Sequence, residues 1–322
     1  MDFSLAAASL LNPPVLFFFL GLLAVWLRSD LEIPQPIPKF LALYLLLAIG
    51  FKGGVALNRS GLDPHLFLVL GVALAASLVI PVWTFFILRS RMGSENAAAV
   101  AATYGSVSAV TFIAATSLLG QIGVPFSGGM VAALALMESP AIIVGVLLAR
   151  RFGGGSGDTF QWGELMREAF FNGSVFVLMG SLVIGAITGA SGDESLAPFT
   201  GGIFKGMLCL FLLDMGLVSA RRLRASRELG MLHAGFAIAA PLGHAAIGLG
   251  LAWMLGLSKG DALLFVVLMA SASYIAVPAA LRLSIPGASP GIYLPMALAV
   301  TFPFNVLVGI PLYLCVINYL WI

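Results

Sequence analysis

Long apolar stretches recur along the whole chain, separated by only short polar segments. A helix needs about 20 apolar residues to cross a hydrocarbon core of about 30 Å. We place such helices near residues 13–28, 38–57, 64–88, 95–120, 125–149, 168–190, 202–219, 231–256, 260–283 and 291–317. Only 9% of the residues are charged, whereas a soluble domain carries about 25%. The sequence therefore predicts one all-α polytopic membrane domain over residues 1–322.

Lysine and arginine divide the nine predicted loops into two kinds. The odd-numbered loops hold most of these residues, including the run from Arg221 to Arg227, which is interpreted either as a solvated surface or as a regulatory contact. The even-numbered loops hold only Arg59, Lys205 and Lys259. Because positive residues favour cytoplasmic loops, we expect a multi-pass protein of the plasma (inner) membrane with both termini outside.

The two halves of the chain resemble one another near their ends. The string YGSVSAVTFIAA begins at Tyr104, and MASASYIAVPAA begins at Met269. One shift along the sequence aligns Ser106 with Ser271, Ser108 with Ser273 and Pro125 with Pro290. Internal similarity of this kind indicates a repeat, although small residues in apolar sequence also match by chance.

We therefore predict two five-helix repeats, over residues 13–149 and 168–317, joined by a short cytoplasmic linker at 150–167. An odd number of helices in each repeat inserts the second copy upside down relative to the first. Inverted repeats of this kind are typical of secondary transporters.

The fourth and ninth predicted helices concentrate small and hydroxyl-bearing residues at mid-span, and Pro278 removes a backbone donor from the ninth. We expect both helices to be discontinuous, because irregular backbone at this depth is tolerated only inside protein or against a cavity. Freed N–H groups at the broken ends would attract an anion. The predicted substrate shell is Ser106, Ser108, Thr111, Ser271 and Ser273. The alternative is that these residues only pack helices together.

Several strings resemble the sodium-dependent bicarbonate transporter family, over about Ile33 to Leu314. They are IPKFLALYLLLAIGFKGGVAL, YGSVSAVT, LMESP, APLGH and LRLSIPGASPGIYLP. The resemblance implies an elevator-type bicarbonate permease with a core domain that moves against a gate domain, in a homotrimer. It also implies that bicarbonate binds between the two breaks, at Gly105, Ser106, Ser108, Ser271 and Ser273. We add the neighbouring Ala272 and Tyr274 to the predicted substrate-binding residues.

Two departures from the family pattern bear on coupling and regulation. Tyr274 stands where the family has an Asp implicated in sodium binding, and a neutral phenol is a poor substitute for a carboxylate around Na⁺. This argues against sodium coupling, and no metal site or other cofactor is predicted. The loop at Arg151 to Arg167 is short and Gly-rich, whereas its long counterpart in cyanobacterial members is associated with a PII-like regulatory partner. That partner is left open.

Three ionisable residues lie inside predicted helices, where charge is costly and usually faces a polar interior. Lys52 and Asp214 occupy nearly equivalent places in the two repeats, and we interpret them either as an ion pair that replaces sodium or as residues that reach water at helix ends. Glu138 precedes Ser139 and Pro140. Burial favours its protonated form, so it is predicted to have a structural or coupling-ion role.

Other functions are less consistent with the residues. No HExxH or GxSxG motif occurs and the histidines are scattered, so an enzyme is not predicted. A channel usually has a ring of charge along its pore, which this sequence lacks. The main alternative is transport of another small anion or a carboxylate by proton coupling or exchange. The expected partners are the solute and membrane lipid, and no nucleic acid.

Overall fold

The computed structural model describes residues 11–61, 63–153, 162–226 and 229–321, and these residues form helices and no strand. The helices of the first half are α2 (Pro13–Trp26), α3 (Pro36–Ser60), α4 (Pro64–Met92), α5 (Ser94–Gly105), α6 (Ala109–Gln121), α7 (Gly129–Glu138) and α8 (Pro140–Phe152). Those of the second half are α9 (Trp162–Phe170), α10 (Gly173–Ala197), η1 (Pro198–Gly202), α11 (Phe204–Ala225), α12 (Met231–Met254), α13 (Lys259–Ala270), α14 (Ala276–Ser284), α15 (Pro290–Leu294), η2 (Pro295–Thr301), α16 (Phe302–Phe304), η3 (Asn305–Gly309) and α17 (Ile310–Leu320). The elements labelled η are π-helical.

Seven helices of the described residues are long and apolar enough to cross a membrane. One of these spans, Gly173–Ala225, covers most of the predicted sixth helix and the whole predicted seventh helix, and its helical geometry is broken at Gly189. A loop at 191–201 was expected there, and the structure has a kink at Gly189 and the π-helical η1 in its place. The fold is that of an all-α polytopic membrane protein, while the total of about ten crossings remains a prediction.

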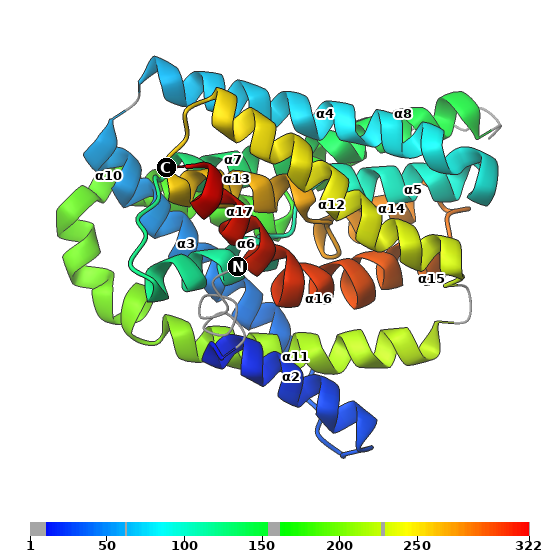
Figure 1. Cartoon of the computed structure of the whole chain (residues 1–322), viewed down its shortest axis with the longest axis horizontal. Coiled ribbons are helices and arrows are strands. Elements are labelled where there is room, and N and C mark those ends of the chain that lie inside the picture. Colours follow the sequence, from blue (N-terminus) through cyan, green and yellow to red (C-terminus); the bar gives the residue numbers. More distant parts are fainter. Residues whose placement is uncertain (1–10, 62, 154–161, 227–228, 322) are drawn as a thin grey trace.

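The helices form two groups. In the first, called here the panel, α3 packs along α10 and α2 packs along α11. In the second, called the bundle, α5 packs between α4 and α8, α7 packs against α4, and α6 and α12 pack against α13. The segments at 106–108 and 271–275 belong to the bundle as well. Figure 1 shows α2 and α11 along one edge of the molecule and α4 and α8 along the opposite edge. Each group therefore combines helices from the first and the second half of the chain.

Glycines bring the panel helices into backbone contact. Gly54 of α3 lies directly against the Leu182 carbonyl of α10, and Gly50 lies against Leu178 one turn away. Gly21 of α2 meets Gly216 of α11 in the same way. Small residues at such crossings are what allow transmembrane helices to approach closely.

Both helices that were predicted to be discontinuous are interrupted. Residues 106–108 separate α5 from α6, and residues 271–275 separate α13 from α14. Pro278 does not cause the second break. It lies in the first turn of α14, where a backbone N–H has no intrahelical partner and proline is tolerated. The inverted repeats at 13–149 and 168–317 remain a prediction.

The linker expected at 150–167 is shorter in the structure, because α8 continues to Phe152 and α9 begins at Trp162. Residues 154–161 lie outside the described residues, as does Arg227 of the basic run.

Candidate functional site

The two interrupted helices meet each other at their breaks. The Ser108 N–H donates to Ser271 Oγ at 2.9 Å, and the Ser273 N–H donates to the Thr103 carbonyl at 2.9 Å. Each break thus satisfies backbone groups of the other, as buried irregular backbone requires. Three of the predicted substrate residues take part in these two bonds, and all three are buried.

The predicted hydroxyls also cap the broken helix ends. Thr111 donates its N–H to Ser108 Oγ at 3.2 Å and its hydroxyl to the same atom at 2.9 Å, which makes Ser108 the N-cap of α6. Ser271 donates to the Leu268 carbonyl at 3.0 Å, at the end of α13. Ser106 donates to the Glu138 carbonyl at 2.7 Å. These hydroxyls therefore shape the site through bonds within the protein.

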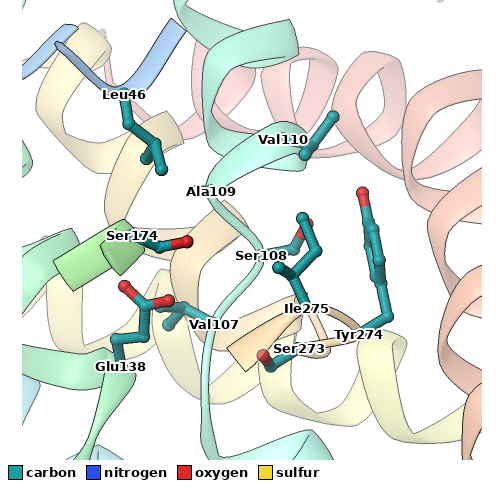
Figure 2. A pocket seen from close by; sticks show the side chains of 10 residues that line it. All are labelled: Leu46, Val107, Ser108, Ala109, Val110, Glu138, Ser174, Ser273, Tyr274 and Ile275. Atoms are coloured by element: carbon teal, nitrogen blue, oxygen red, sulfur yellow. The ribbon is translucent and has the colours of Figure 1, made fainter. Parts of the chain in front are cut away.

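A small cavity lies beside the two breaks (Figure 2). It offers about 20 Å³, which is room for a water-sized group. It is lined by Leu46, Val107, Ser108, Ala109, Val110, Glu138, Ser174, Ser273, Tyr274 and Ile275. Leu46 and Ser174 come from the panel, and the other residues come from the bundle. We call this the central cavity. An anion with four non-hydrogen atoms, such as bicarbonate, requires it to widen.

The cavity wall includes the first turn of α6. Ala109 and Val110 are the first two residues of that helix. Their N–H groups are among the four that a helix leaves without intrahelical partners, and they carry the positive end of the helix dipole. These amides suit an anion. A helix N-terminus alone does not make a binding site, so the side chains around it decide what the cavity can bind.

Glu138 is the only charged residue of the cavity lining, and it is 5% exposed. Its Oε2 atom is buried and has no hydrogen-bond partner among the described residues. In Figure 2 the carboxyl points toward Ser174, on the other side of the interrupted segment from Tyr274. A buried carboxyl without a partner is costly. This group is therefore expected to take up a proton or a cation.

Tyr274 provides the second unsatisfied polar atom of the cavity. Its buried hydroxyl lies near the Ser108 side chain but lacks the geometry of a full hydrogen bond to it. Its ring packs edge-on against Phe302, with centroids 5.4 Å apart. The tyrosine thus offers an unused hydroxyl donor at the place where the family resemblance implies an aspartate.

The other predicted residues lie behind the cavity wall. Gly105, Ser106, Thr111, Ser271 and Ala272 are buried but do not line the cavity. Gly105 has no room for a side chain, because a Cβ atom would collide with the Pro81 ring of α4. The sequence did not single out Leu46 or Ser174, nor the apolar lining residues Val107, Ala109, Val110 and Ile275. Leu46 lies within the string IPKFLALYLLLAIGFKGGVAL, but only the packing of the panel brings Leu46 and Ser174 to the site.

The hypothesis of an ion pair between Lys52 and Asp214 is wrong. Lys52 is exposed on α3 with its Nζ atom beside Gly201, while Asp214 is buried in α11. Among the described residues, the single ion pair joins Arg59 to Asp193. The alternative, that both residues reach water near helix ends, does not fit Asp214, which is buried in the middle of α11, whereas Lys52 is exposed. Lys52 therefore cannot supply the positive charge of the central cavity.

Replacing Ser271 by alanine is expected to lower the free energy of unfolding by about 1–3 kcal/mol, because the buried Ser108 N–H loses its partner. Thermal unfolding of the purified protein in detergent measures this loss. The matched control is Ser117→Ala, since that hydroxyl makes no hydrogen bond among the described residues. Equal shifts of the unfolding midpoint in the two variants would contradict the bond between the breaks.

Interrupted membrane helices that meet in a buried cavity between two helix groups define a class of protein, the secondary membrane transporters. Comparison with family models then identifies the family. The model of the Na⁺-dependent bicarbonate transporter superfamily matches residues 13–318, and the chain belongs to this superfamily. It is a transporter and not an enzyme. None of the curated proteins matches this chain.

Proposed function

We propose that this protein is a carrier that moves bicarbonate together with a cation across the plasma membrane. The observation that carries the proposal is the unpartnered Glu138 carboxyl in the same small cavity as the first amides of α6. If Glu138 is ionised, an anion bound beside it meets a like charge in a site of low dielectric, which is strongly unfavourable. A proton or a sodium ion on Glu138 removes that repulsion.

This arrangement links the binding of the anion to the binding of the cation. Each ligand binds more tightly when the other is present, as linkage requires. The lining of the central cavity contains no lysine, arginine or histidine, and Lys52 lies outside it. No cationic side chain of this lining can therefore take the place of the coupling ion. The nearby oxygens of Ser174 and Ser273 belong to the type that a hard cation such as Na⁺ prefers. The family membership favours sodium, and the neutral Tyr274 favours a proton.

The position of the cavity supports an elevator-type motion. Eight of its ten lining residues belong to the bundle, and the panel contributes only Leu46 and Ser174. The bundle can therefore carry the bound anion past the panel, and the same displacement can widen the cavity. The orientation with both termini outside, the homotrimer and a PII-like partner remain predictions.

The test is uptake of labelled bicarbonate by proteoliposomes under imposed sodium and proton gradients. We expect saturable uptake that is accelerated by an inward gradient of one of the two cations. Counterflow distinguishes a carrier from a channel, because only a carrier exchanges labelled for unlabelled solute without a net driving force. If bicarbonate gave no signal under any gradient, the substrate assignment would be wrong.

A second candidate is a proton-coupled carrier of a small carboxylate. The Tyr274 hydroxyl favours it, because a phenol donates a hydrogen bond to a carboxylate without holding a metal ion. Competition by unlabelled formate and acetate in the same assay separates the two. Inhibition that is stronger than inhibition by bicarbonate would favour the carboxylate.

A further inference from the structure

A second cavity lies on the same boundary between panel and bundle. It is lined by Lys52, Val55, Ala56, Arg59 and Ser60 of α3, by Phe126 and Ser127, and by Asp193 of α10. We call it the Lys52 cavity. Its volume is about 540 Å³, within the range of small-molecule sites. The central cavity is far smaller, so a small anion can enter the Lys52 cavity without rearrangement.

The side chains of the Lys52 cavity carry a net positive charge. Arg59 and Asp193 neutralise each other through a 2.7 Å ion pair between α3 and α10. Lys52 is exposed, and no carboxylate of the described residues lies within ion-pair distance of it. One ammonium group therefore remains uncompensated within a concave surface. Such a surface focuses the electric field and raises the local concentration of counter-ions.

The Lys52 cavity also lies close to the central cavity along α3. Lys52 follows Leu46, which lines the central cavity, by six residues, or about 9 Å along a helix axis. Gly53, next to Lys52, packs against Val131 of α7 and marks the same contact of panel with bundle. An anion held by Lys52 is thus a short distance from the site where Glu138 and the α6 amides lie.

We propose that the Lys52 cavity is a second, low-affinity binding site for small oxyanions, which collects bicarbonate before it enters the central cavity. The identity of the ligand rests on the proposed function. The positive potential of the cavity does not, because it follows from Lys52, Arg59 and Asp193 alone. In the predicted orientation Arg59 belongs to an outside loop, so the cavity opens to the exterior.

The potential can be measured without transport. Ser60 lines the cavity, and a Ser60→Cys substitution in a chain lacking Cys209 and Cys315 provides a single thiol. The measurement is the ratio of its reaction rates with an anionic and a neutral methanethiosulfonate reagent, in detergent. Lys52→Gln is expected to lower this ratio by about twofold, which corresponds to losing one charge at about 12 Å, the rise from Lys52 to Ser60 along α3, in a largely aqueous environment.

Two further variants fix the sign of the effect. Asp193→Asn frees Arg59 and is expected to raise the ratio, whereas Lys205→Gln removes an exposed lysine outside the cavity and should leave it unchanged. The Lys52→Gln, Asp193→Asn and Lys205→Gln proteins should all remain folded, because charges at the protein surface contribute little to stability. An unchanged ratio in folded Lys52→Gln and Asp193→Asn proteins would overturn the positive potential.

Binding itself is tested by protection of the same thiol. Bicarbonate is expected to slow the modification of Ser60→Cys by the neutral reagent, with a saturable dependence that Lys52→Gln abolishes. Chloride at equal ionic strength is the control for screening. If bicarbonate gave no more protection than chloride, the oxyanion site would be wrong. Loss of transport with protection intact would instead count against the proposed function.

Discussion

Glu138→Gln is expected to abolish uphill accumulation of bicarbonate while leaving downhill exchange in place. Glutamine keeps the size and polarity of the side chain but cannot be ionised, so the anion no longer needs a cation beside it. The binding of sodium or of a proton is then no longer coupled to the binding of the anion, so a cation gradient cannot drive accumulation. In proteoliposomes with an inward cation gradient, the ratio of internal to external bicarbonate should fall to about one, whatever the wild-type ratio.

The control is Glu95→Gln, which removes a carboxylate from the first turn of α5, outside the central cavity. It should retain cation-driven accumulation. Counterflow in the Glu138→Gln protein shows that the carrier is folded and active. Accumulation in Glu138→Gln with the cation dependence of the wild type would show that coupling lies elsewhere, and the role proposed for Glu138 would have to be abandoned.

The fold could be predicted largely because the bilayer limits what an apolar chain can do. Every predicted helix overlaps a helix of the structure, and the hydroxyl-rich stretches at Ser106 and Ser271 mark the two breaks. Finer features were not predicted. The interruption at Ser139 directly precedes Pro140, and the π-helical η1 and η2 begin at Pro198 and Pro295, local irregularities that apolar periodicity does not encode.

The residues of the site could be predicted only in part. Hydroxyls at the breaks are evident from the sequence, but the sequence does not show whether they bind solute or cap helices. In the structure the hydroxyls of Ser106, Ser108 and Ser271 make hydrogen bonds within the protein. Glu138 reaches the central cavity because α7 ends beside the first break. The sequence position of Lys52 suggested an ion pair with Asp214. In the structure the Lys52 side chain is exposed on α3 and the Asp214 side chain is buried in α11, so the two do not form an ion pair. Equivalent places in two repeats need not lie in contact.

The contact between α3 and α10 carries the second large expected effect, that of Gly54→Ala. Gly50 and Gly54 are four residues apart and therefore lie on one face of α3, against the Leu178 and Leu182 carbonyls of α10. A methyl group on Gly54 would collide with the Leu182 carbonyl oxygen. Backbone atoms cannot rotate away as a flexible side chain would, so the two helices must move apart along the whole crossing.

We expect Gly54→Ala to lower the free energy of unfolding by about 1–3 kcal/mol or more, because overpacking a rigid contact strains every neighbour along it. The measurement is the thermal unfolding midpoint in lipid nanodiscs, together with the yield of monodisperse protein. Gly180→Ala in α10 is the matched control, since no atom lies within 4 Å of its added Cβ and alanine favours the helix by about 1 kcal/mol. The two variants differ only in what the added methyl meets. Equal midpoints would therefore mean that α3 and α10 do not touch at Gly54, and the panel that borders both cavities would not be packed as described.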